Sequence, residues 1–176
     1  MKLFRLIVVA IIISISGLSY GQNDDLKAFS EEQLARLDKS DAERVIAPNT
    51  DVKIAPPESF VKESTINGFI HKGSSTSIQV ITIRNAGYQS VTKSLTNEYF
   101  EKQGFTLEKT EEMILQNGEP AKLYITSFST NAEKYQRIFF FTGKENTIWI
   151  NVNYPKIVEG LLYKPVISSL KTVSQG

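Results

Sequence analysis

The residue types that most often carry catalysis are scarce in this chain. Of its 176 residues none is cysteine and one, His71, is histidine. Disulfides, thiolate nucleophiles, haem attachment and thiolate metal sites are therefore excluded, and one chain cannot supply a two-histidine zinc site. A serine–histidine pair would have to use His71. The sequence predicts no catalytic, metal-binding or cofactor-binding residue and no cofactor.

One short polar loop is the candidate binding element. His71, Lys72, Gly73, Ser74 and Ser75 lie between two apolar runs. Backbone N–H groups, hydroxyls and the lysine ammonium could together form an anion-binding nest there. The alternative is an ordinary polar hairpin loop, because Gly and Ser are typical of turns. The phosphate-binding loop pattern is absent, since Lys72 precedes Gly73 and no helix is expected to follow.

Acidic residues do not form a catalytic pair in the sequence. Glu111 and Glu112 are adjacent on an expected strand, so their side chains point to opposite faces and cannot flank one bond. Asp38, Asp41 and Glu43 lack the spacing of a calcium-binding loop. The aromatic residues follow strand spacing, which favours core packing over stacking on bases or sugars.

The N-terminus has the pattern of a secretory signal peptide. Lys2 and Arg5 precede the apolar run 6–13, and the small residues Ser19 and Gly21 have the spacing that signal peptidase reads. The alternative is an uncleaved anchor, but polar and small residues interrupt the run before it reaches the length of a membrane span. We expect cleavage after residue 21 and a periplasmic or secreted protein with no remaining span.

Charge and composition exclude several kinds of partner. Lys and Arg number 20 against 19 Asp and Glu, and the chain is 41% hydrophobic and 22% charged. These values are typical of one soluble globular domain, and no strong field attracts nucleic acid. Loss of residues 1–21 would change the formal charge from +1 to −1, because it removes two basic residues and no acid.

Residues 22–50 differ from the rest of the chain. They are rich in charge and poor in large apolar residues, and a capping box at 30–33 predicts a short helix over 31–38. The alternative is a solvated spacer ahead of the domain. Prolines at 48, 56 and 57 mark the start of a single domain, which we place at 51–176.

The domain is expected to be mainly strand. Residues 51–55 predict a short edge strand, and 68–71 with 76–83 predict a hairpin. Four strands in a meander follow, over 105–116, 121–129, 135–142 and 147–154, with Asn117-Gly118 as the first turn. Tight turns between successive strands make the sheet antiparallel, with about six to seven strands.

Two helices are expected to cover the sheet. Val91, Leu95 and Tyr99 recur every four residues before Gly104, which predicts one amphipathic helix of about 12 residues. Leu162, Val166 and Leu170 predict a second helix, over 164–173. Pro165 either starts that helix or kinks it, and we favour a start.

The last two strands of the meander should be buried on both faces. A loop at 143–146 places Thr142 opposite Thr147. Alternation then puts four residues on one face, Phe139, Phe141, Ile148 and Ile150, and three on the other, Ile138, Phe140 and Trp149. Apolar residues on both faces predict central strands that are covered on both sides.

These elements resemble the PsbP-like superfamily. The resemblance rests on Ile54-Ala55-Pro56-Pro57-Glu58-Ser59-Phe60, Phe69, Ser77-Ile78-Gln79-Val80, the helix ending at Gly104, the turn Asn117-Gly118-Glu119-Pro120-Ala121 and the hairpin 139–154. It covers about two-thirds of the chain and includes exported proteins of the DcrB type. It implies an α+β sandwich, with an antiparallel sheet between helical layers, and binding or accessory roles. Metal ligands proposed for the photosynthetic members have no matching residues here.

The sequence thus predicts an exported bacterial protein that acts as a non-catalytic binding or accessory module of the cell envelope. Its partner would be an envelope protein or a small ligand. The alternative is a hydrolase that uses carboxylates or a Ser-His pair. Binding loops would lie at 71–75 or at 85–88, because strands and helices are committed to the core.

Overall fold

The computed structural model describes residues 43–176, which form an α+β fold. Seven antiparallel strands make the main sheet in the order β3-β4-β5-β9-β8-β7-β6, and β1, β2 and β10 make a smaller sheet. The strands are β1 (Val45–Ile46), β2 (Val52–Ile54), β3 (Val61–Glu63), β4 (Gly68–His71), β5 (Thr76–Ile83), β6 (Thr106–Ile114), β7 (Pro120–Thr130), β8 (Glu133–Thr142), β9 (Thr147–Pro155) and β10 (Ser174–Gln175). The α-helices are α3 (Tyr88–Thr92), α4 (Asn97–Lys102) and α5 (Glu159–Lys171).

The predicted fold class is confirmed. The 68–71/76–83 hairpin is β4–β5, and the four-strand meander is β6–β9. The signal peptide and the helix at 31–38 lie outside the described residues. The domain start at 51 stays a prediction. Residues before 51 also belong to the fold, because β1 at Val45–Ile46 pairs with β2 and Ala47 is buried.

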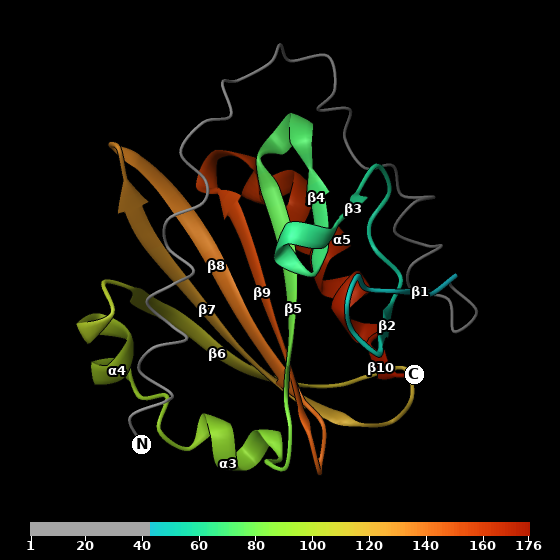
Figure 1. Cartoon of the computed structure of the whole chain (residues 1–176). Helices are drawn as coiled ribbons and strands as arrows, with labels where there is room; N and C mark the ends of the chain where they lie inside the picture. Colours follow the sequence, from blue (N-terminus) through green and yellow to red (C-terminus); the bar gives the residue numbers. More distant parts are fainter. Residues whose placement is uncertain (1–42) are drawn as a thin grey trace.

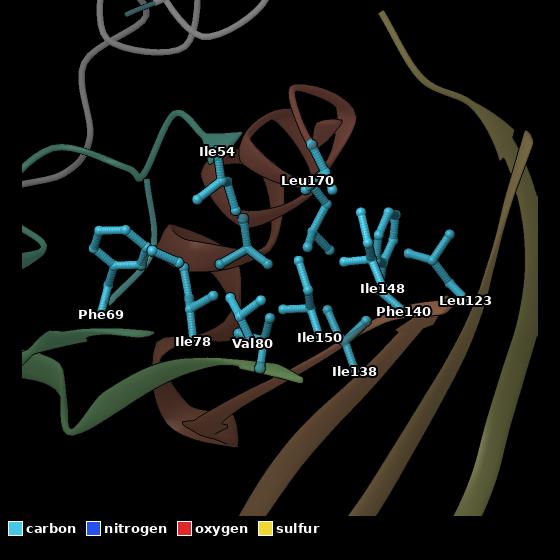
Figure 2. Close-up of a cluster of buried hydrophobic side chains, with 14 of the residues drawn as sticks. Ile54, Phe69, Ile78, Val80, Leu123, Ile138, Phe140, Ile148, Ile150 and Leu170 are labelled. Carbon is cyan, nitrogen blue, oxygen red and sulfur yellow. The ribbon is translucent and has the colours of Figure 1, made fainter. Parts of the chain in front are cut away.

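The main sheet has two differently built faces (Figure 1). On the first, which we call the aliphatic face, α5 and the small sheet cover a continuous apolar core (Figure 2). The central strands of the main sheet contribute side chains to this core, among them Ile78, Val80, Leu123, Ile138, Phe140, Ile148, Ile150 and Val152. On the second, the aromatic face, α3, α4 and the residues that join them lie over Tyr124, Phe139, Phe141 and Trp149.

The predicted register of the β8–β9 hairpin is wrong by one residue. Thr142 pairs with Ile148, so Phe141 lies opposite Trp149 and Phe140 opposite Ile150. The connection therefore spans five residues. Gly143 has φ +99°, and a Cβ atom there would lie 2.1 Å from the Asn146 carbonyl oxygen. A one-residue slip exchanges the faces, so Phe139 and Phe141 share a face with Trp149, while Ile138 and Phe140 share one with Ile148 and Ile150. Burial on both faces is confirmed.

The predicted 12-residue helix is two short helices. The hydroxyl oxygen of Thr96 accepts a hydrogen bond from the Tyr99 N–H and caps α4, so a new helix begins there. Val91, Leu95 and Phe100 still face the sheet. Gly104, with φ +80°, follows the end of α4 as expected.

The start of the C-terminal helix is also different from the prediction. α5 begins at Glu159, after a 3₁₀ turn at Lys156–Val158, and Pro165 lies inside it. Proline removes one N–H from the helix ladder. The helix nevertheless continues, and it buries Leu162, Val166 and Leu170 against the aliphatic face.

The strand predicted at 51–55 is not an edge of the main sheet. It is β2, the central strand of the small sheet, with β1 on one side and β10 on the other. Val52 and Ile54 are fully buried. The three two- or three-residue strands β1, β3 and β10 are too short to have been detected by alternation.

Candidate binding sites

The loop predicted as a binding element is a tight 3₁₀ turn, Lys72–Ser74, with Ser75 in the left-handed region at φ 51°. Inside it, His71 Nδ1 lies 2.7 Å from Ser74 Oγ, and Ser74 Oγ lies 2.7 Å from Thr76 Oγ1. Phe60 stacks on the His71 ring at 5.4 Å. All three polar side chains are buried, so this network holds the turn together.

A surface hollow of about 330 Å³ lies beside this turn. His71, Lys72 and Gly73 line it together with Ser59 and Val61. Ser74 and Ser75 do not line the hollow, and the Ser75 N–H donates to the Lys72 carbonyl oxygen. The structure thus brings three of the five predicted loop residues to one hollow, with Lys72 as the exposed cation.

The larger groove, about 460 Å³, lies between the α3–α4 segment and two strands, the edge strand β6 and its neighbour β7. Its lining is Tyr88, Gln89, Thr92, Lys93, Leu95, Asn97, Leu107, Thr110, Glu112, Lys122 and Tyr124. This groove was not predicted from the sequence, because the helical spacing of 91–99 predicts one continuous helix there. The capping residue Thr96 was the signal for a break. Of the second predicted loop, 85–88, only Tyr88 reaches the groove.

Polar and apolar groups alternate in the groove. Tyr124 donates its hydroxyl to the Thr92 carbonyl oxygen at 3.3 Å, and Lys122 Nζ lies 5.4 Å from the centre of the Tyr124 ring. Lys93 and Glu112 are exposed at its border. Such a lining suits a partner that presents both apolar and hydrogen-bonding groups.

A small apolar gap continues beneath α4. It has a volume of about 10 Å³ and is lined by Leu95, Tyr99, Phe100, Gln103, Phe105, Phe139, Phe141 and Trp149. That volume holds about one water molecule. Trp149 Nε1 is buried without a hydrogen-bond partner. The two short helices therefore cover the aromatic face less completely than α5 covers the other one.

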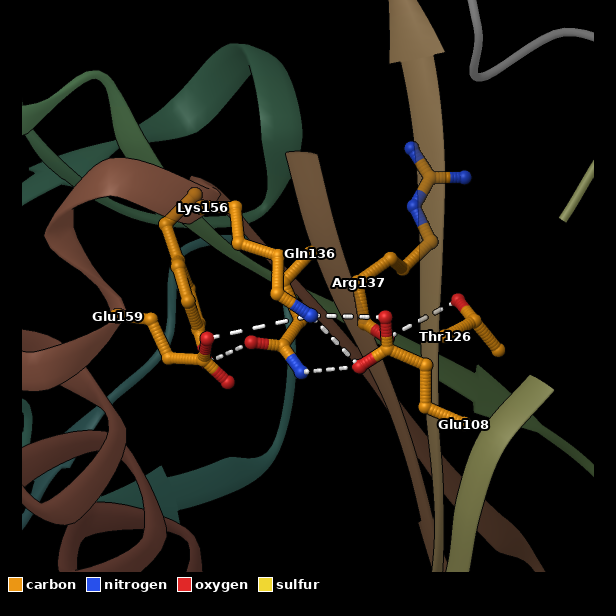
Figure 3. Close-up of polar contacts among 7 residues, drawn as sticks. Glu108, Thr126, Gln136, Arg137, Lys156 and Glu159 are labelled. Carbon is orange, nitrogen blue, oxygen red and sulfur yellow. Dashed lines mark hydrogen bonds and ion pairs between the residues drawn. The ribbon is translucent and has the colours of Figure 1, made fainter. Parts of the chain in front are cut away.

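A polar cluster closes the far end of the aliphatic face (Figure 3). Glu108 lies at a bulge in β6, between Leu107 and Lys109, and both its oxygens accept from Lys156 Nζ at 2.8 Å. Tyr154 donates to Gln136 Oε1 at 3.0 Å. The hydrogen bond from Lys156 holds the pKa of Glu108 below its ordinary value. Burial raises the pKa of Tyr154.

Arg137 points to the opposite face from that cluster (Figure 3). Its guanidinium carbon lies 5.0 Å, 5.2 Å and 5.7 Å from the ring centres of Phe105, Phe128 and Phe139. Its Nε donates to Asn153 Oδ1. Burial lowers the pKa of Arg137 to about 10, so the side chain stays charged at neutral pH. We call this arrangement the Arg137 cage.

Metal binding and membrane crossing find no support in residues 43–176. No three His, Asp or Glu side chains in that range are grouped as metal ligands. None of the helices in the same range has the length and apolar character needed to span a bilayer.

Comparisons with known proteins give a likeness of fold. The chain is similar to the crystal structure of LpqN, a protein involved in cell envelope biogenesis of Mycobacterium tuberculosis, with a TM-score of 0.54 and 12% identity. The match covers 70% of this chain and 82% of LpqN. A Bacteroides thetaiotaomicron structure has a TM-score of 0.50 at 15% identity over 76% of this chain, which spans about half (48%) of that protein.

No family model and no curated protein matches this sequence. The two structures show a likeness of α+β fold, and neither carries the PsbP-like name. Membership of that superfamily stays a prediction.

Proposed function

We propose that this protein is a non-catalytic binding module that serves an accessory role in the bacterial cell envelope. The observation that carries the proposal is the groove of about 460 Å³ between the α3–α4 segment and β6–β7. It is the larger of the two surface hollows described above, and its mixed lining offers hydrogen bonds and apolar contact without an assembled acid–base pair.

Two features support a role in the envelope. The N-terminal pattern of a basic start, an apolar run and small residues is typical of exported proteins. LpqN, which shares the fold, is involved in cell envelope biogenesis. We place the mature protein in the periplasm or outside the cell, and the PsbP-like resemblance adds binding or accessory roles. The partner is an envelope protein or a small ligand.

Site-specific photo-crosslinking in living cells tests the proposal. A photoreactive amino acid replaces Gln89, which is exposed and lines the groove. The matched control replaces Lys164, which is exposed on α5 and lines none of the hollows described above. We expect a discrete crosslinked envelope component from position 89 and none from 164. Equal crosslinking at both positions, or none at either, would contradict binding through the groove.

A hydrolase is the second candidate, because one contact favours it. His71 Nδ1 lies 2.7 Å from Ser74 Oγ, a distance at which histidine can activate a hydroxyl. Against this, Ser74 is 4% exposed and its hydroxyl also contacts Thr76. Esterase, peptidase, glycosidase and phosphatase substrates decide between the two functions. Turnover that His71→Ala abolishes would overturn the non-catalytic proposal.

A further inference from the structure

The strand register places a row of polar side chains across the aromatic face. Thr126, Arg137, Asn153 and Ser77 are successive partners on β7, β8, β9 and β5. The next row toward the helices includes Asn151 and Gln79. On the aliphatic face, the adjacent row of Ile125, Ile138, Val152 and Ile78 is wholly apolar, as expected for packing, although the row beyond it carries Ser127, Gln136 and Tyr154.

Arg137 is the charged member of this row. It is 6% exposed, and three phenyl rings surround it at cation–π distance. A guanidinium has five N–H donors. The described residues accept from only one of them, where Nε donates to Asn153 Oδ1. No Asp or Glu in residues 43–176 forms an ion pair with it.

The hydrogen bonds around Asn153 fix how the guanidinium is presented. Asn153 accepts from Arg137 through Oδ1 and donates through Nδ2 to Ser77 Oγ at 3.4 Å. Both ends of the amide are thus engaged, and the two terminal nitrogens of Arg137 stay available. In Figure 3 they point away from Glu108 and Lys156, the nearby ion pair of the opposite face.

A buried polar atom without a hydrogen-bond partner lies beside the cage. Asn151 Oδ1 is buried without a hydrogen-bond partner. Asn151 pairs with Phe139, so it is a diagonal neighbour of Arg137 on the same face. Ser77, Gln79, Ile81 and Phe128, which lie on this face around the two groups, are only partly buried, so this part of the face is not closed off from solvent.

We propose that the Arg137 cage is a binding site for an organic oxyanion, a carboxylate or a phosphate carried on an apolar body. A buried cation without a carboxylate is unfavourable, and an oxyanion would accept from the two terminal nitrogens in parallel. The phenyl rings would contact the apolar body. A donor on the ligand would satisfy Asn151 Oδ1. This site is separate from the groove, and its test is independent of the crosslinking result.

Trp149 is a built-in reporter for this site. It is the only tryptophan in the sequence, and it stacks on Phe139, one of the rings of the cage, at 6.4 Å. The full natural chain is titrated at low salt with four probes: phenylacetate, phenyl phosphate, inorganic phosphate and benzyl alcohol. We expect a saturable change in Trp149 emission with one or both organic anions below about 10 mM, and none with neutral benzyl alcohol.

The four probes distinguish the sources of the anion. Saturation by phenylacetate alone assigns a carboxylate, and saturation by phenyl phosphate alone assigns a phosphate ester. Inorganic phosphate that binds as tightly as phenyl phosphate would overturn the proposal that the ligand carries an apolar body. Benzyl alcohol that binds as tightly as phenylacetate, or no saturation by any anion, would overturn the site.

Arg137→Met keeps the length and apolar contacts of the stem and removes the charge. We expect it to abolish anion binding, whereas Lys134→Met, which removes an exposed cation from the same strand, leaves binding unchanged. Unchanged binding in Arg137→Met would overturn the proposal. If that variant does not fold, NMR of the natural chain decides. The Arg137 Nε–H resonance should shift with the organic anion and not with benzyl alcohol, and no shift would overturn the site.

Discussion

The two faces of the main sheet are built from the same strands but differ in what covers them. Over the aliphatic face, the 13-residue helix α5 and the small sheet exclude solvent from side chains such as Ile138 and Phe140. Over the aromatic face, the five- and six-residue helices α3 and α4 leave a groove, an apolar gap and a polar row. The comparison indicates a division of labour. One face carries the larger apolar core, and the other carries the hollows on which the proposed binding role rests.

The sharpest test of this division compares two adjacent phenylalanines on β8. Phe140 is fully buried on the aliphatic face, and Phe141 is 2% exposed on the aromatic face. We expect Phe140→Ala to lower the free energy of unfolding by about 3–5 kcal/mol, because the surrounding core cannot collapse into the cavity. Phe141 borders an existing gap beneath the six-residue helix α4, so we expect Phe141→Ala to have the smaller effect. Urea unfolding of both variants measures the difference.

Equal losses in the two variants would show that both faces are packed alike. The substitution removes the same atoms from the same strand at nearly the same burial, so the covering layer is the variable that differs. A larger loss for Phe141→Ala would reverse the proposed division.

The register of the β8–β9 hairpin decides which residues reach which face, and Gly143 supports that register. Its φ of +99° is disfavoured for other residues, and a Cβ atom would meet the Asn146 carbonyl oxygen. We expect Gly143→Ala to destabilise the fold by about 3 kcal/mol through backbone strain. Thermal unfolding monitored by circular dichroism gives the value. Lys144→Ala, at an exposed neighbouring position, serves as the control and should be nearly neutral.

This hairpin also shows where prediction from sequence stops. Strand identity follows from alternation and turn residues, so the meander and its antiparallel order were predictable. The pairing depends on how many residues the loop takes up, and Gly143 tolerates a backbone that makes the loop five residues long. A change of one residue reverses every inward and outward position, and local sequence patterns do not determine that number.

Leu95 lies between α3 and α4 and tests the cover of the aromatic face. It is 9% exposed and lines both the groove and the gap. We expect Leu95→Ala to lower the free energy of unfolding by about 2 kcal/mol. This is at the lower end for a leucine, because the groove and the gap already leave part of the space around it empty. Hydrogen exchange should accelerate in α3 and α4 and stay unchanged in α5. Uniform acceleration across both helical layers would contradict a separately weak cover.

The proposed sites on the aromatic face could not be predicted from the sequence for a related reason. Arg137 and Asn153 are 16 residues apart, and Arg137 and Phe105 are 32 apart. Only strand pairing brings them together, so the cage follows from register and not from a local motif. The His71 loop was predictable because its five residues are contiguous, but burial of Ser74 depends on the fold around it.

The smallest expected effect concerns the ion pair at the end of the aliphatic face. Lys156 lowers the pKa of Glu108, so the pair stabilises the fold at neutral pH. The stabilisation is complete above the ordinary carboxyl pKa of about 4.3. It is lost as the pH falls from that value through the lower pKa of the folded state. Both side chains are a little over one-quarter exposed, which limits the gain to about 0.5–1 kcal/mol.

Glu108→Gln should lose that amount at pH 7 and match the natural chain at low pH in urea unfolding. Glu112→Gln, an exposed control on the same strand, should show no such convergence. Glu108 Oε2 also accepts a hydrogen bond from Gln136 Nε2 at 3.4 Å. A Glu108→Gln difference that persists at low pH would mean that Glu108 acts through this contact and its place at the bulge, not through its charge.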